Sequence, residues 1–474
     1  MYLNAVVAVG AAVAFMAVAA GCAGAGDDRA GGKPEPTALT LTMANGAGNR
    51  PVELPPFADE VARLSGGKMR IEFRDRWLGW PWRRPESAVI HDVAAGKADL
   101  GWVGSRAWDD VGISSFNALH APLLVDSYTL QAEVLESDIP GEMLKALEPL
   151  RLVGLGVLPG PLRKLLGVER PLTQAADFRG QRIGITDSRV ARESLRALGA
   201  TAIALPAGAR IGGLDGIEQS VDSIEGITYD AAAKYLTTNI NLWPRPLVLF
   251  MNEAAFAALE PTQRDVLREA VRNALPKTLA AVRSRERDAA AVLCRRGLSF
   301  AVATRADIST LREDLAPVYR ELERDDQTRV FIARIAKLRQ ALSVSAETLP
   351  ACSTGERSAS AAIPDGVYTN TTTADDARRA RIPAGDPFYA RLPVRHRLVL
   401  KSGDFVFYDI FPNGRTEVGA SGTYSVYRDR IIFQTGEDKI PLEWSLEGDM
   451  LKFDDGGKGG YYGAGFTPPF TRTG

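Results

Sequence analysis

The feature that most constrains the fold of this chain is a regular alternation of strand-like and helix-like segments that begins near Ala38. Short runs rich in apolar and β-branched residues alternate with stretches that carry apolar residues at helical spacing and end at glycines. The expected strands are residues 39–43, 69–73 and 98–103, and the expected helices between them are 57–64 and 85–95. This β-α-β-α-β order predicts a parallel or mixed sheet with helices on both faces.

The alternation starts again after Leu150, which indicates a second α/β unit. Strands are expected at 152–158, 182–185, 201–205 and 247–251, with a helix at 189–198 and mostly helical sequence from 261 to 342. A chain of 474 residues is too long for one ordinary core. Two α/β lobes would meet at a cleft, and ligands favour such interfaces and the carboxyl ends of such strands.

The helical signal disappears in the last quarter of the chain. Residues 343–362 are rich in Ser and Ala and contain Pro350, as expected of a linker. From 363 to 474, short β-type runs are separated by turn sequences such as Asn413-Gly414. This spacing predicts a small antiparallel β-barrel or meander domain.

The first 37 residues have the composition of an export segment. Residues 5–20 are an unbroken apolar run followed by Gly21 and Cys22, too short to span a bilayer but suited to a signal peptide over residues 1–22. Residues 19–22, Ala-Ala-Gly-Cys, resemble a bacterial lipobox, in which the Cys accepts a lipid. An Ala stands where the lipobox usually has Leu, and no Lys or Arg precedes the run, so a simple cleaved signal or a weak anchor stays open. Residues 23–37 then predict a flexible tether.

Charge and reactive residues exclude several functions. The 57 basic and 58 acidic residues nearly cancel, so no field for binding nucleic acid is expected. The three histidines are far apart, and no nucleophile or phosphate-binding motif is present, so we expect no catalytic residue, metal or cofactor. Cys294 and Cys352 could pair in an oxidising compartment, but spacing alone cannot decide this.

Residues 39–342 resemble the solute-binding proteins of tripartite ATP-independent periplasmic (TRAP) transporters, of the dicarboxylate-binding type. The resemblance rests on an ordered series of short motifs: 57–61 (Phe-Ala-Asp-Glu-Val), 96–101 (Gly-Lys-Ala-Asp-Leu-Gly), 121–124 (Ala-Pro-Leu-Leu), 170–172 (Arg-Pro-Leu), 177–183 (Asp-Phe-Arg-Gly-Gln-Arg-Ile), 197–200 (Ala-Leu-Gly-Ala), 221–225 (Val-Asp-Ser-Ile-Glu) and 234–237 (Lys-Tyr-Leu-Thr). It implies a two-lobe periplasmic-binding-protein-like fold, a long hinge helix and closure around one solute.

The departures from this family fall at the expected binding site. The family places an Arg that forks onto the substrate carboxylate where this chain has Gly184, and glycine cannot make that bidentate pair. Arg163 matches a second family arginine. The motif 222–226 retains Glu225 but lacks the ligand-facing Asn that follows it. Asn252 matches the Asn that opens the helix after the last strand, where helix capping is the simpler explanation.

Two further residues are candidate solute contacts. Trp102 ends an expected strand at the carboxyl edge of the first sheet, where an indole stacks on rings or cations, although core packing explains it too. Ser105 offers a hydroxyl donor nearby. Without an Arg at position 184 we expect weak binding of simple dicarboxylates. A neutral, aromatic or cationic solute then fits this site as well as an organic acid does. The exception would be a guanidinium supplied from elsewhere, by Arg189 or Arg245.

The sequence therefore predicts an exported, lipid-anchored binding protein rather than an enzyme. It would capture a small-molecule solute outside the cytoplasmic membrane through Arg163, Trp102, Ser105, Glu225 and Asn252 and present it to a membrane permease. The alternative is a surface sensor or scaffold lipoprotein that has lost transport. The C-terminal part is similar to the lipocalin-like β domains of exported bacterial proteins, on the motifs 365–368, 422–426 and 444–449.

Overall fold

The computed structural model describes residues 38–46, 51–79, 84–206, 208–343, 345–352, 363–380, 382, 386–427, 430–435, 438–454, 465, 466 and 468–473. The expected signal peptide with Cys22, the tether and the larger part of the expected linker lie outside the described residues. No helix formed by the residues that are described is both long enough and apolar enough to cross a bilayer.

The first sheet is mixed and has the strand order β2-β1-β3-β10-β4. β1 runs parallel to β2 and β3, whereas β10 is antiparallel to β3 and β4. Its strands are β1 (Leu39–Ala44), β2 (Met69–Arg74), β3 (Leu100–Gly104), β4 (Leu152–Leu158) and β10 (Leu247–Asn252). Because β10 comes late in the chain, the polypeptide leaves this sheet after β4 and later returns to insert β10 between β3 and β4.

The second sheet holds the intervening strands in the order β11-β9-β5-β8-β6-β7. β6 is parallel to β7 and β8, and β5 is antiparallel to β8 and β9. The strands are β5 (Arg163–Gly167), β6 (Arg182–Ile185), β7 (Thr201–Ala204), β8 (Gly216–Ser220), β9 (Tyr235–Thr237) and β11 (Ser299–Ala301). Two sheets joined by several chain crossings confirm the predicted pair of α/β lobes.

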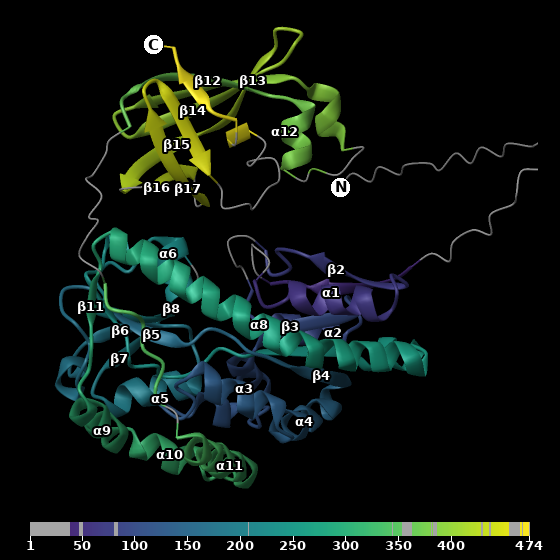
Figure 1. Ribbon diagram of the computed structural model, residues 1–474, viewed down its shortest axis with the longest axis vertical. Helices are drawn as coiled ribbons and strands as arrows, with labels where there is room; N and C mark the ends of the chain where they lie inside the picture. Colours follow the sequence, from purple (N-terminus) through teal and green to yellow (C-terminus); the bar gives the residue numbers. More distant parts are fainter. Residues whose placement is uncertain are drawn as a thin grey trace, which may run out of the picture. The chain divides into compact units, whose positions relative to one another are not determined.

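Helices cover both sheets, and one of them belongs to both lobes. They are α1 (Pro55–Leu64), α2 (Ser87–Ala94), α3 (Tyr128–Glu136), α4 (Ile139–Leu144), α5 (Arg189–Ala197), α6 (Val221–Ile227), α7 (Glu253–Ala258), α8 (Pro261–Arg295), α9 (Arg305–Asp314), α10 (Ala316–Leu322) and α11 (Asp326–Leu342). The 35-residue α8 passes both sheets (Figure 1). Its first half buries Leu267 in the core of the first lobe, and its last turns bury Leu293 in the core of the second. This is the long hinge helix that the family resemblance implies.

Two strands of the first sheet are buried on both faces, which explains why they could be recognised as apolar runs in the sequence. All six residues of β10 and all five of β3 are buried, so these strands are nearly continuous apolar runs. At about 25 cal/mol per Å², burial of each large side chain stabilises the fold by roughly 1.5–3 kcal/mol. β10 is hydrogen bonded to β3 and β4 at once, so it joins β4 to the rest of the first sheet.

The C-terminal part forms a closed eight-stranded antiparallel barrel. Its strands are β12 (Gly366–Thr372), β13 (Val394–Lys401), β14 (Asp404–Ile410), β15 (Thr416–Tyr427), β16 (Arg430–Thr435), β17 (Asp438–Glu447), β18 (Met450–Asp454) and β19 (Phe470–Arg472), and a short helix, α12 (Ala374–Arg379), follows β12. Side chains of β13 alternate between buried Leu398 and exposed Lys401 in the period of two that a barrel requires. Aromatic rings fill the interior, with Phe405 and Phe433 centred 4.8 Å apart. The barrel alternative of the prediction is therefore confirmed.

A disulfide ties the start of the expected linker to the second lobe. Cys294, in the last turn of α8, is bonded to Cys352, so the pairing that the sequence left open is formed. The amide of Leu349 donates to the carbonyl of Thr238 at 3.3 Å, and the Leu349 side chain is buried. Residues 345–352 therefore pack on the second lobe, and the expected linker does not begin as a free tether at residue 343.

Candidate functional site

The chain passes between the two sheets in paired segments that carry the candidate site. The amide of Arg163 donates to the carbonyl of Trp243 at 2.9 Å, and the amide of Arg245 donates to the carbonyl of Pro161 at 3.0 Å. Gly160 permits this close approach, because a Cβ atom there would lie 1.7 Å from the carbonyl oxygen of Arg245. The crossing from β4 to β5 and the crossing from β9 to β10 thus form one tied junction between the lobes.

Arg163, at the start of β5, is buried and already bound by protein groups. Its Nε and Nη2 pair with the carboxylate of Glu218 on β8, with a distance of 3.1 Å from Nη2 to Glu218 Oε2. Nη2 also donates to Thr186 Oγ1 at 2.7 Å, and the indole of Trp243 donates to Glu218 Oε1 at 3.1 Å. Only 4% of Arg163 is exposed. The predicted cation is at the junction, but Glu218 balances its charge.

A second ion pair comes from the first lobe. Arg106, in the 3₁₀ segment η1 (Ser105–Val111), pairs with Glu86, which also accepts from the amide of Gly104 at 2.6 Å. Burial alone would raise the pKa of Glu86, but Arg106 and Arg245 hold it below its ordinary value. Burial lowers the pKa of Arg106. The carboxylate of Glu86 raises this pKa in part, and the positive charges of Arg245 and Arg163 lower it further.

Ser105 is buried beside a histidine that burial keeps neutral. Ser105 Oγ and His120 Nε2 are hydrogen bonded at 2.6 Å, and both side chains are buried. Burial, and then the charges of Arg106 and Arg163, lower the pKa of His120 to about 3. Ser105 therefore belongs to this junction, although its hydroxyl is used within the protein.

Trp102 lies under a guanidinium. The guanidinium carbon of Arg245 is 5.7 Å from the centre of the Trp102 ring, and the indole donates to Asn45 Oδ1 at 3.2 Å. Trp102 is 4% exposed and packs in the core of the first lobe. This placement corrects the expectation of an indole open to solute: the ring supports Arg245 and is otherwise a core residue.

Glu53 is a third acidic group of the cluster. Its side chain is buried, and burial raises its pKa to about 7 against the opposing effect of Arg245, while Asp222 raises it further. The junction therefore brings three guanidinium groups together with the carboxyl groups of Glu86, Glu218 and Glu53, and burial leaves Glu53 about half protonated near neutral pH. Such a group of buried, perturbed charges between two lobes is typical of a binding site.

Position 184, where the family has an arginine, is crowded by apolar side chains. A Cβ atom on Gly184 would lie 2.8 Å from Leu214 Cδ1, 3.0 Å from Ile217 Cγ2 and 3.2 Å from Leu205 Cδ2. The space beside Gly184 is therefore filled by apolar side chains instead of being open for a ligand.

Glu225 and Asn252 have structural partners in place of the expected solute contact. Glu225 is 1% exposed, and its carboxylate pairs with Arg285 at 3.0 Å, with Arg296 at 3.3 Å and with Arg430 of the barrel. These bonds use both carboxylate oxygens.

Asn252 ends β10 and caps α7, since its Oδ1 accepts from the amide of Ala255 at 3.0 Å. It lies at the opposite end of β10 from Leu247, the strand residue that pairs with Gly104 of β3 near the junction. Asn252 is therefore a helix cap outside the charged cluster.

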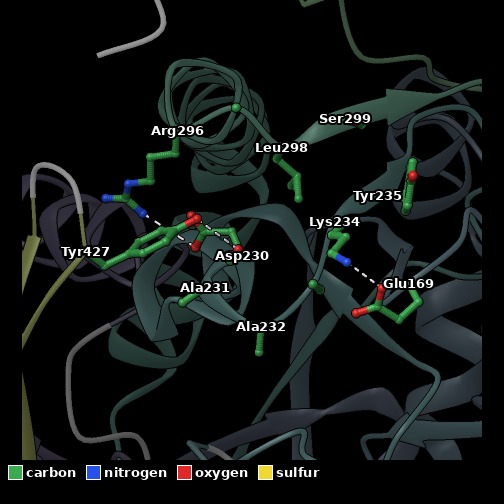
Figure 2. Close-up of a pocket in the computed structure, with 12 residues that line it drawn as sticks. Glu169, Asp230, Ala231, Ala232, Lys234, Tyr235, Arg296, Leu298, Ser299 and Tyr427 are labelled. Carbon is green, nitrogen blue, oxygen red and sulfur yellow. Dashed lines mark hydrogen bonds and ion pairs between the residues drawn. The ribbon is translucent and has the colours of Figure 1, made fainter. Parts of the chain in front are cut away.

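A separate crevice lies beside the second sheet (Figure 2). It has a volume of about 440 Å³ and is bordered by Ala231, Ala232, Leu298 and Ser299. Figure 2 shows Arg296 and Tyr427 directed toward Asp230, and Lys234 paired with Glu169. None of the predicted solute contacts borders this crevice, and its charged groups are already paired with one another.

Most of the charged cluster was missed by sequence reasoning. Glu218 lies inside a buried strand of the pattern Gly-Ile-Glu-Gln-Ser, and a charged residue within such a strand is a usable signal. Arg245 stands between Pro244 and Pro246, which marks a rigid segment. Glu53 and Glu86 carry no local signal of this kind.

Two α/β lobes, joined by paired crossings and one shared helix, with buried charges at the junction, define a two-lobe solute-binding protein. Residues 52–325 match the family described as bacterial extracellular solute-binding protein, family 7 (DctP), and this chain belongs to that family. It is therefore an extracytoplasmic binding protein and not an enzyme, and the resemblance to TRAP solute-binding proteins is confirmed over residues 52–325.

Solved structures show the same fold for the two lobes. A TRAP periplasmic solute-binding protein from Ochrobactrum anthropi, whose C-terminus is bound in its ligand-binding pocket, is 20% identical, with a TM-score of 0.58 over 65% of this chain and 98% of that one. A sugar-acid-binding protein from Advenella mimigardefordensis, in complex with galactonate, is 20% identical, with a TM-score of 0.57 over 64% and 99%.

A third protein, from Desulfovibrio salexigens with bound orotic acid, is 18% identical, with a TM-score of 0.57 over 64% of this chain and 99% of that one. Nearly the whole length of each of these proteins is matched, whereas about a third of this chain lies beyond the match. The barrel is therefore an addition to the two-lobe fold that they share.

Proposed function

We propose that this chain captures a small-molecule solute between its lobes and delivers it to a membrane permease of the TRAP type. The observation that carries the proposal is the cluster of three guanidinium groups and their carboxylates at the crossing between the two sheets. In a protein of this family, lobe closure about that crossing would bury the cluster together with the solute. Glucuronate, galacturonate, galactonate and orotate, which are bound by proteins of the same fold, are the first compounds to test.

Native mass spectrometry of the purified protein tests this function. We expect one solute per chain, either co-purified or acquired on addition of a compound, because the junction offers one cluster of charges. A chain that shows no bound mass with acidic, neutral or amine compounds, before and after denaturation and refolding to remove endogenous solute, would contradict the proposal.

Attachment to the membrane through Cys22 is the second part of the proposal. The small residues before Cys22 and the Gly-, Asp- and Pro-rich segment after it support a lipid anchor with a tether. We expect the wild type to sediment with membranes and the Cys22→Ala variant to be released, because one acyl-bearing anchor is removed. Fractionation followed by immunoblotting measures this, with Glu169→Gln, a change in an exposed surface pair, as a control that keeps the anchor. Equal distribution of wild type and Cys22→Ala would refute lipid anchoring.

A surface sensor or scaffold is the second candidate function. It is favoured by the added barrel, which is bonded to the second lobe through Arg430 and Glu225 and through Tyr427, whose hydroxyl donates to the carbonyl of Asp230 at 3.0 Å. Uptake of labelled solute by cells distinguishes the two functions. Loss of uptake on deletion of this chain supports transport, whereas unchanged uptake together with solute binding supports a sensor.

A further inference from the structure

The three arginines at the junction differ in how their charge is used. Arg163 is bound by Glu218 and Thr186, and Arg106 by Glu86. Among the described residues, the side chain of Arg245 makes a cation–π contact with Trp102 but no hydrogen bond or ion pair. It is also only half-buried, unlike Arg163. Arg245 is therefore the guanidinium that keeps its donors for another molecule.

The backbone holds Arg245 in a fixed place. Pro244 and Pro246 restrict the chain on either side of it. The carbonyl of Pro246 accepts from the amide of Ser105 at 2.9 Å, and the amide of Arg245 is bonded to Pro161. The ring of Trp102 supports the guanidinium from one side, which reduces the side-chain entropy that binding would cost.

Near neutral pH, the two carboxyl groups that interact with Arg245 do not fully neutralise its positive charge. Glu86 lies close enough to feel the charge of Arg245 but is paired with Arg106. The other acid is Glu53, whose pKa is lowered by the charge of Arg245 and raised by that of Asp222, and its backbone carbonyl accepts from Thr278 Oγ1 of α8 at 3.2 Å. Because burial raises the pKa of Glu53 to about 7, this carboxyl is neutral in about half of the molecules at that pH.

We propose that Arg245, in place of the missing arginine at position 184, binds the carboxylate of an acidic solute. This inference rests on the solute-binding function proposed above and names its substrate class, a small organic acid. The guanidinium offers the planar donor pair that a carboxylate accepts. Gly184 supplies no guanidinium and apolar side chains crowd the space beside it, so the cation would come from the crossing between the lobes instead of from β6.

Calorimetry with glucuronate, galacturonate, galactonate and orotate tests the role of Arg245. We expect at least one of these acids to bind the wild type, and Arg245→Gln to weaken that binding by about 10- to 100-fold, the effect of losing charge-assisted hydrogen bonds. Arg245→Lys should recover part of the affinity, because it restores the charge without the fork. Arg268→Gln is the control, since Arg268 lies 5.1 Å from the ring of Phe256, away from the junction.

The pH dependence of the wild type tests the same proposal without a variant. Ionised Glu53 would compete for Arg245 and repel an anion, so affinity for an acid should fall by up to about tenfold between pH 6 and pH 8. Glu53→Gln should remove this dependence. A cationic solute would show the opposite slope.

Two kinds of failure are distinguishable. Unchanged acid binding by Arg245→Gln, affinity that rises with pH, or a bound solute that is neutral or cationic would overturn the assignment of Arg245 while leaving solute binding intact. The absence of any bound solute in native mass spectrometry would overturn the proposed function itself.

Discussion

Glu225→Gln is expected to lower the free energy of unfolding by about 3–5 kcal/mol, the range found when one member of a buried ion pair is removed. The carboxylate of Glu225 is the shared partner of Arg285, Arg296 and Arg430. Arg296 is itself 1% exposed, so its charge would remain buried with a neutral amide in place of its partner. Denaturant unfolding, followed by circular dichroism, measures the change.

A matched substitution separates this effect from the loss of an ordinary surface pair. Glu169→Gln removes a carboxylate that pairs with Lys234, where both side chains are more than half exposed, and should change stability by no more than about 1 kcal/mol. A similar small change in Glu225→Gln would show that Glu225 is not a central ion-pair residue. A selective loss of solute affinity with stability unchanged would restore the sequence-based assignment of Glu225 to the binding site.

The fold could be predicted from sequence because its signals are local. In β10 and β13 the burial of each residue follows directly from a continuous apolar run or from alternation, which need no knowledge of the rest of the chain. The break near residue 343 was visible as a change from helical to hairpin signals. The packing of residues 345–352 on the second lobe carried no such signal, because the disulfide of Cys352 depends on a partner 58 residues away.

The site could be predicted only in part, because its charges come from separate stretches of the chain. Arg163 and Ser105 were identified from a family motif and from a strand end, but their partners Glu218 and His120 lie 55 and 15 residues away. Whether a carboxylate such as Glu225 faces solute or three arginines depends on tertiary packing. Asn252 shows the reverse case, since a local capping pattern described its role correctly.

Removal of the Cys294–Cys352 disulfide is the second change with a large expected effect. The bond closes a loop with a sequence separation of 58 residues, for which loop-closure entropy predicts a stabilisation of about 4 kcal/mol. The loop contains α9, α10 and α11, and its end is held on the second lobe by Leu349. The extracytoplasmic location of the family fits a disulfide that persists.

The double variant Cys294→Ser/Cys352→Ser should therefore unfold at a lower denaturant concentration than the oxidised wild type. Hydrogen exchange should also become faster at the amides of Glu347 and Leu349, which donate to the carbonyls of Asp126 and Thr238. Reduction of the wild type with dithiothreitol should reproduce both changes, and the same treatment of the double variant should add nothing. If instead the variant and the wild type unfold at the same denaturant concentration, the disulfide does not stabilise the protein by restricting the unfolded chain. The packing of residues 345–352 alone would then hold this segment on the lobe.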